Sequence, residues 1–152
     1  MRNHDFKLFP ELSNAQMNEH YHSSPHKQIV EDFRATVTKV HDGDTITLKW
    51  SERDFEFPLR LRDIDAPELN MAGGEKARLH LQRLIEGKEV EVLIDPENRT
   101  EKWGRILGDI MQAGVLMSEE MTRMGEATPF DERRETELPN IERELRLKQW
   151  LT

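Results

Sequence analysis

The sequence contains no cysteine among its 152 residues. A disulfide framework, a thiolate nucleophile and a thiolate zinc site are therefore all excluded. It also lacks an apolar run long enough to span a bilayer, and polar residues follow the initial methionine where a secretory signal would be hydrophobic. We therefore expect a protein without a membrane segment or signal peptide, located in the cytoplasm or within a larger assembly.

Positive charge is scarce relative to negative charge. Lysine and arginine number 22 against 30 aspartates and glutamates, which gives a formal net charge of -8. This balance argues against a general nucleic-acid-binding surface, so any bound polyanion would need a local basic site, a cation or both. Because an acidic body repels nucleic acid over the screening length, association with such a partner should be slow and strongly salt-dependent.

Hydrophobic periodicity is absent from residues 1–30, which we interpret as an extended polar N-terminal arm. This arm holds four histidines, His4, His20, His22 and His26. They have two interpretations, a transition-metal site or a solvated segment. Since an arm without its own core is usually ordered by lying on something else, residues 1–30 are also a candidate binding segment for a protein partner.

Residues 31–152 have the length of one domain, and regular hydrophobic periodicity begins at Phe33. Residues 33–38, 46–50 and 55–61 alternate apolar and polar side chains, which predicts an antiparallel meander of three strands. Two further strands are predicted at residues 89–94 and 104–111. Apolar residues recur at helical spacing in residues 75–88, 117–124 and 138–145, which predicts three helices. This order of elements indicates an α+β fold, a small barrel with helices at its side.

Two acidic clusters stand where predicted strands end. Asp44 lies in the stretch HDGDT, residues 41–45, and Asp65 lies in DIDAPE, with Glu68 three residues further along. Each stretch alone also fits a tight turn with exposed acids. If adjacent antiparallel strands bring Asp44 and Asp65 together, however, their oxygen atoms suit calcium or magnesium.

Arginines complement these carboxylates. Arg60 precedes Asp65 on the predicted third strand, on the face opposite Leu59 and Leu61. A second positive cluster, in NRTEKWGR, contains Arg99, Lys102 and Arg105, and alone it would be a solvated loop. Arginine forks, a metal and a carboxylate that handles a proton are together what phosphodiester hydrolysis requires.

Five motifs occur in the order seen in staphylococcal nuclease-like domains. They are HDGDTITL, LRLRDIDAPE, GEKARLHLQRLIEGKEVEV, EKWGRILGDI and MSEEMTRMGEAT. The chain resembles this family over about residues 33–130, and more loosely through the terminal helix with Trp150. The resemblance implies a five-stranded OB-type β-barrel with about three α-helices, and calcium-dependent hydrolysis of DNA and RNA.

The resemblance also implies a ligand set for the metal. Asp44 and Asp65 match the family's carboxylate ligands, and its main-chain carbonyl ligand falls on Ala66. Asp42, the first acid of the opening motif, matches a residue that supports these ligands. The family favours Ca²⁺, although oxygen ligands also permit Mg²⁺ or Mn²⁺.

Catalytic roles follow from the same resemblance. Glu68 matches the acid that positions or deprotonates the attacking water, and Arg60 and Arg105 match the two arginines that clamp the phosphate. Lys102 matches a lysine near a terminal phosphate of the substrate.

The chain departs from the family at the substrate-base site, where well-known members carry tyrosines. The only tyrosine here is Tyr21, in the arm, so Phe130 or Trp103 would have to stack on the base. A second interpretation remains, an assembly or adaptor module with little catalysis. The presence of the catalytic set favours the nuclease interpretation.

Overall fold

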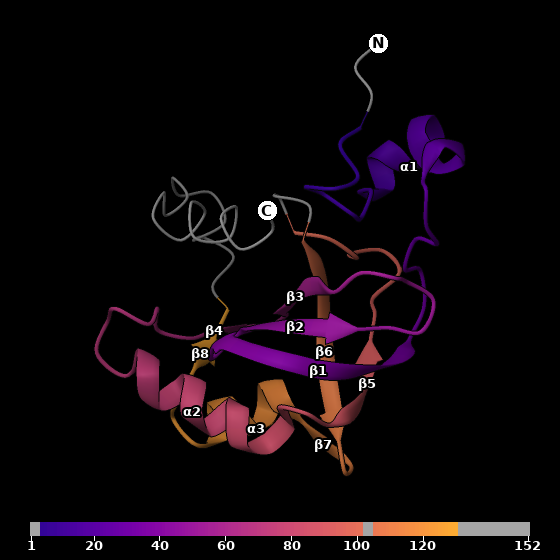
Figure 1. Ribbon diagram of the computed structural model, residues 1–152. Helices are drawn as coiled ribbons and strands as arrows, with labels where there is room; N and C mark the ends of the chain where they lie inside the picture. Colours follow the sequence, from indigo (N-terminus) through magenta and orange to yellow (C-terminus); the bar gives the residue numbers. More distant parts are fainter. Residues whose placement is uncertain (1–3, 102–104, 131–152) are drawn as a thin grey trace.

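The computed structural model describes residues 4–101 and 105–130 (Figure 1). The predicted helix at 138–145 and Trp150 lie outside this part of the chain. The barrel strands are β1 (Phe33–Asp42), β2 (Thr45–Lys49), β3 (Phe57–Leu61), β5 (Glu89–Leu93) and β6 (Ile106–Gln112). Their order in the sheet is β3-β2-β1-β5-β6, and a parallel pairing of β3 with β6 closes the ring. The predicted five-stranded, OB-type α+β barrel is confirmed.

Three short strands accompany the barrel. β7 (Val115–Leu116) forms a hairpin with β6, and β4 (Ile64–Asp65) pairs with β8 (Thr128–Pro129). The β4 and β8 pairing brings the end of the described chain back to Asp65, beside the acidic cluster.

The barrel core contains the apolar side chains that alternate along the strands. Ile46, Leu48, Leu59 and Leu61 are completely buried. Arg60 lies between two of these leucines and is also buried, at 6% exposure, because β4 and the Phe130 ring lie against its side chain.

Two helices pack beside the barrel as their periodicity predicted. α2 (Gly74–Ile85) buries Ala77, Leu81 and Ile85 and lies along β1. α3 (Met117–Arg123) packs against β6 and buries Met117 and Met121. The third methionine of this spacing, Met124, is 46% exposed. It lies outside the core because the helix already ends at Arg123.

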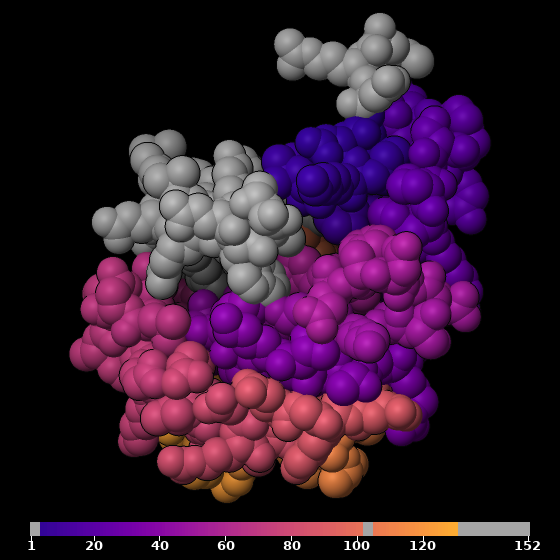
Figure 2. Space-filling model, in the orientation of Figure 1, coloured from indigo at the N-terminus to yellow at the C-terminus, as the bar shows by residue number. Residues whose placement is uncertain are grey.

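The N-terminal segment contains a short helix, α1 (Asn14–His20), and a 3-10 turn (Tyr21–Ser23), which its sequence did not predict. Leu12 and Ile29 are buried, so the segment contributes side chains to the folded body. In Figure 2 its indigo surface adjoins the surface of later parts of the chain. Among the described residues, every helix is too short or too polar to cross a bilayer.

Candidate functional site

The HDGDT stretch forms the tight connection between β1 and β2, with Gly43 and Asp44 between the paired residues Asp42 and Thr45. The Asp42 carboxylate accepts a hydrogen bond from the Asp44 backbone N–H at 3.0 Å and so stabilises the turn. Through this contact Asp42 supports the backbone of Asp44.

Gly43 is needed for space rather than for backbone freedom. A Cβ at this position would lie 2.7 Å from the Ala66 Cβ and 2.9 Å from the Ala77 Cβ. Its φ lies outside the left-handed region, so the turn does not depend on the backbone freedom of glycine. The absent side chain lets the turn approach both α2 and the segment after Asp65.

Asp44 connects the hairpin to the following segment. Its completely buried carboxylate accepts hydrogen bonds from the Ala66 backbone N–H at 2.9 Å and from the Thr45 hydroxyl at 3.1 Å. Its backbone carbonyl accepts from the Leu61 N–H at 2.7 Å. Burial of a carboxylate requires such partners. They fix the position of the Asp44 side chain at the turn of the hairpin.

Arg60 lies between the two predicted metal-binding carboxylates. Its Nη2 is 3.4 Å from Asp44 Oδ2 and 3.6 Å from Asp65 Oδ1. Its Nη1 donates to the Ile64 carbonyl at 2.8 Å and to the Leu61 carbonyl. The structure thus brings Asp44, Arg60 and Asp65 together at the end of β3.

Arg105 lies on the neighbouring rim. Its Nη1 is 3.4 Å from the Thr45 hydroxyl, and Thr45 pairs with Arg60 across β2 and β3. Its Nε contacts the Glu101 carboxylate, an ion pair that sequence reasoning missed although the two residues are four apart. Thr45 therefore links the two arginines, and Glu101 orients the second one.

The segment carrying Ala66 and Glu68 turns tightly into α2. The Glu68 carbonyl accepts from the Met71 N–H at 2.9 Å, and a Cβ on Gly74 would lie only 1.9 Å from that carbonyl oxygen. Glycine at position 74 therefore lets the chain approach the backbone of Glu68. The Glu68 side chain is half-buried.

Among the candidate substrate-binding residues, Phe130 lies at the site. Its ring centroid is 5.9 Å from the Arg60 guanidinium carbon, and its backbone N–H donates to the Asp63 carbonyl at 2.9 Å. Lys102 and Trp103 lie outside the described residues.

The donor chemistry at this site suits a hard divalent cation. Asp44 and Asp65 offer carboxylate oxygens, and Ala66 follows directly with its main-chain carbonyl. Across residues 4–101 and 105–130, no three acidic or histidine side chains are grouped closely enough to form a metal site. A cation here would therefore depend on two carboxylates that Arg60 already contacts, on main-chain oxygen and on water.

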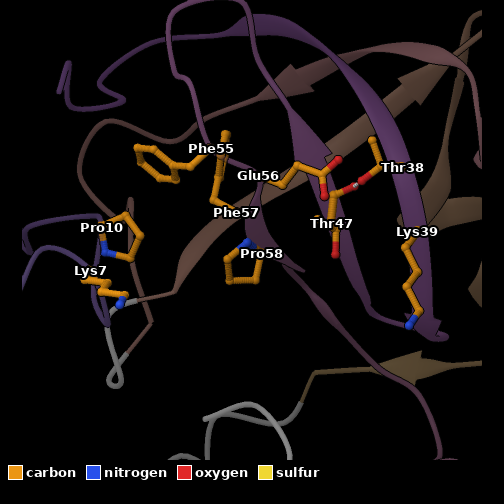
Figure 3. Close-up of a pocket in the computed structure, with 9 residues that line it drawn as sticks. All are labelled: Lys7, Pro10, Thr38, Lys39, Thr47, Phe55, Glu56, Phe57 and Pro58. Carbon is orange, nitrogen blue, oxygen red and sulfur yellow. Dashed lines mark hydrogen bonds between the residues drawn. The ribbon is translucent and has the colours of Figure 1, made fainter. Parts of the chain in front are cut away.

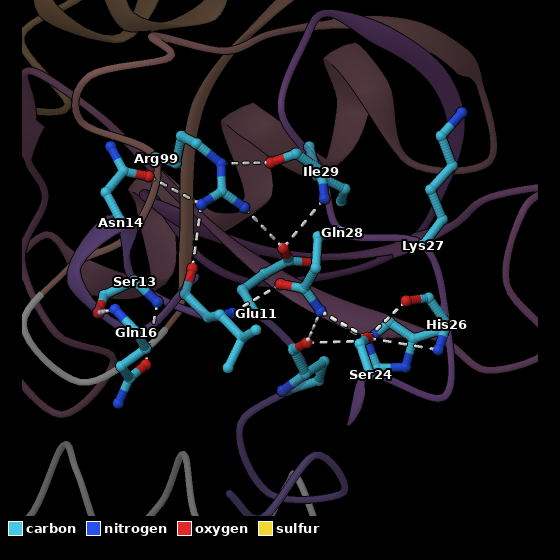
Figure 4. Close-up of polar contacts among 12 residues, drawn as sticks. Glu11, Ser13, Asn14, Gln16, Ser24, His26, Lys27, Gln28, Ile29 and Arg99 are labelled. Carbon is cyan, nitrogen blue, oxygen red and sulfur yellow. Dashed lines mark hydrogen bonds and ion pairs between the residues drawn. The ribbon is translucent and has the colours of Figure 1, made fainter. Parts of the chain in front are cut away.

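Arg99 does not belong to this cluster, so its predicted place beside Arg105 is wrong. It is buried against the N-terminal arm, where its Nη2 lies 3.2 Å from Glu11 Oε2 and its Nη1 donates to the Leu12 carbonyl at 3.0 Å (Figure 4). Burial lowers the pKa of Arg99, while the Glu11 charge opposes that shift. Arg99 is thus an anchor for the arm.

Two of the arm histidines contact backbone carbonyls of the arm itself. The Nε2 of His4 lies 2.8 Å from the Phe9 carbonyl, and the Nε2 of His26 lies 2.8 Å from the Pro10 carbonyl. Burial lowers the pKa of His26. These contacts pack the arm against itself.

Comparisons with known proteins show which family the chain resembles in sequence. The family model described as "Staphylococcal nuclease homologue" matches residues 58–149. The chain is 39% identical over 83 residues to a probable staphylococcal-like nuclease of Oryza sativa subsp. japonica, covering 53% of this chain and 24% of that protein. It is 40% identical over 77 residues to a micrococcal nuclease of Shigella flexneri, covering 51% of this chain and 41% of that protein.

A staphylococcal-like nuclease of Arabidopsis thaliana is 38% identical over 96 residues, which cover 61% of this chain and 28% of that protein. The matched region therefore spans less than half the length of each of these relatives. The family match, over residues 58–149, includes Arg60, Asp65 and Glu68. The closed barrel, the juxtaposed acids and arginines, and these matches lead to one conclusion: the chain belongs to the staphylococcal nuclease homologue family.

Proposed function

We propose that this chain is a metal-dependent nuclease that hydrolyses phosphodiester bonds of DNA, RNA or both. The observation that carries the proposal is the position of Arg60 between the Asp44 and Asp65 carboxylates, with Arg105 linked to the same rim through Thr45. Fixed guanidiniums beside oxygen ligands can stabilise the charge that develops on a phosphoryl group.

Each residue has a role in this proposal. Arg60 and Arg105 donate to the phosphoryl oxygens, and their buried contacts hold the guanidiniums in place before substrate arrives. Glu68 orients the attacking water and accepts its proton. Asp44, Asp65 and the Ala66 carbonyl would hold Ca²⁺, or Mg²⁺ or Mn²⁺, which when bound neutralises phosphate charge and lowers the pKa of water.

The first test is degradation of single-stranded DNA by the purified chain with calcium, with magnesium and with a chelator. We expect metal-dependent cleavage that falls at least about a hundredfold in Glu68→Gln and in Arg105→Ala, since general bases and charge-stabilising donors each contribute on that order. Glu97→Gln and Arg83→Ala, both exposed on the surface, are the matched controls and should retain wild-type rates.

Two results would contradict the proposal. No cleavage with any of the metals would favour the alternative, an assembly module that uses the barrel to bind protein partners. Cleavage that persists in both variants would mean that another part of the chain, or a contaminant, performs the reaction.

A further inference from the structure

A groove of about 420 Å³ lies between the N-terminal arm and the outer face of β1, β2 and β3 (Figure 3). Lys7 and Pro10 of the arm form one wall, and Lys39 of β1 stands at the opposite end. The floor includes Thr47 of β2 and Pro58 of β3. None of these five residues belongs to the site described above.

The groove continues the face that carries Arg60. Along β3, Pro58 and Arg60 project to the same side, because side chains alternate and the intervening Leu59 is in the core. Across the strands, Thr47 pairs with Pro58 and Thr45 pairs with Arg60. Two residues along a strand span about 7 Å, a step comparable to one nucleotide of an extended single strand.

The arm wall is held in place by a buried ionic cluster. Glu11, at 2% exposure, contacts Arg53 from the β2–β3 connection and Arg99 from the β5–β6 connection. Next to it, the Gln28 amide donates to the Pro10 carbonyl at 2.9 Å and accepts from the Leu12 N–H at 2.7 Å. Because Pro10 is adjacent to Glu11, this cluster fixes the groove wall to the barrel.

The chemistry of the lining matches a nucleotide. Lysines at the two ends offer positive charge to successive phosphates, and Phe55 and Pro58 present apolar surface to a base or sugar. Glu56 also lines the groove, and its carboxylate can accept a hydrogen bond from a base amino group or a ribose hydroxyl. Its charge disfavours a phosphate at the centre, which leaves the phosphates to the lysine ends.

The shape of the groove bears on how many nucleic-acid strands it can hold. The arm bounds the groove on one side and the sheet bounds it on the other, an arrangement that suits one extended strand with its base turned toward the apolar floor. In a duplex the bases are paired inside and the second strand would meet the arm. We therefore expect the groove to favour unpaired nucleic acid.

We propose that this groove is a subsite for the nucleotide next to the scissile phosphate in single-stranded nucleic acid, with the N-terminal arm as its outer wall. The inference rests on the proposed nuclease function and adds a substrate class and a binding role for the described part of the arm, residues 4–30. It also assigns Lys7 and Lys39 as phosphate-binding residues that act outside the catalytic cluster.

The test measures equilibrium binding with the full chain carrying Glu68→Gln, in calcium, so that the probe is not cleaved. The probe is a fluorescein-labelled nine-nucleotide oligothymidylate followed by anisotropy. We expect Lys7→Ala with Lys39→Ala to weaken binding about tenfold or more and to lower the salt slope by roughly 0.7 for each phosphate that a lysine no longer neutralises. Lys39→Arg should retain affinity, and Lys88→Ala, exposed between α2 and β5, is the control.

Unchanged affinity and salt slope in the double lysine variant, or equal affinity for a duplex of the same length, would overturn the subsite. Since both lysines are exposed, their removal should leave the melting temperature unchanged, which distinguishes weaker binding from unfolding. Cleavage by the wild-type chain reports on the proposed function separately. If the wild-type chain cleaves DNA and the double lysine variant binds the probe as tightly as its parent, the proposed nuclease function stands and the proposed subsite is rejected.

Discussion

At the scale of single residues, His41 is held in its neutral form by the fold. Its Nε2 contacts the Thr47 hydroxyl at 2.6 Å, and burial, with the nearby Lys39 charge, lowers its pKa to about 4 from a usual value of 6.5. An unfolded chain therefore takes up a proton at this site at higher pH than the folded chain does. Protonation of His41 thus favours unfolding.

We expect stability to decrease as pH falls from 6.5 toward 4, the window between the two pKa values of His41. His41 should account for about 1–2 kcal/mol of this loss in the free energy of unfolding, after a reduction for its partial solvent exposure. Urea unfolding of wild type and His41→Gln at several pH values measures this. The stability difference between the two proteins should change with pH across that window and level off above pH 7, and a constant difference would contradict the prediction.

The sequence predicted which residue types meet at the site but not how they are held. Alternation placed Arg60 on a polar face and the acids at strand ends, whereas the resemblance to the family was needed to join Asp44, Arg60 and Asp65 into one site. The role of Gly43 could not be predicted, because the methyl groups that exclude a side chain belong to Ala66 and Ala77, and only the three-dimensional fold brings them near.

At the scale of elements, the arm depends on one buried carboxylate. Glu11 is the shared counter-charge of Arg53 and Arg99, and Arg53 is otherwise surrounded by aromatic rings, with the Phe57 ring centroid 4.5 Å from its guanidinium carbon. Burial lowers the pKa of Arg53. Removing the negative charge leaves two guanidiniums close together in a poorly solvated place.

Glu11→Gln should therefore destabilise the fold by about 3–5 kcal/mol, whereas Glu97→Gln, on an exposed turn, should change it little. Chemical denaturation gives the magnitude. Limited proteolysis shows whether the effect concerns the arm, since cleavage within residues 4–30 should become faster in Glu11→Gln. Equal proteolysis of the two variants would show that other contacts hold the arm.

Long periodic elements were predictable and short polar ones were not. The five barrel strands follow from the pattern of apolar residues along each strand, and α2 follows from apolar residues at helical spacing, because burial selects the side chains on one face. α1 lacks any buried residue, and its start at Ser13 is set by a capping box with Gln16. Arg99 was misplaced because the arm that buries it lies more than eighty residues away in the chain.

At the scale of the whole molecule, charge acts in two opposing ways. The net charge of -8 repels a polyanion at long range, while arginines and lysines near the site attract phosphate at short range. Salt screens the long-range term first, because the Debye length falls from about 30 Å at 0.01 M to about 10 Å at 0.1 M.

We therefore expect kcat/KM on long single-stranded DNA to rise between about 0.01 and 0.1 M salt and to fall at higher salt, as salt ions compete for the phosphates. Steady-state cleavage against sodium chloride concentration measures the profile. A small phosphodiester with one negative charge is the control and should vary less. A flat profile for DNA would mean that the surface charge has no part in substrate capture.

The parallel pairing of β3 with β6 also has a consequence for synthesis of the protein. Arg60 stands opposite Leu107 in that pairing, and Arg105 lies just before β6, so the two arginines meet only when these strands join. A ribosome that has released residues up to β5 has produced Asp44, Arg60, Asp65 and Glu68, but the ring is still open. Contacts between segments this distant form late in folding. A nascent chain therefore cannot assemble both arginines on one rim before β6 joins β3, so the activity that we propose would begin only when the barrel is complete.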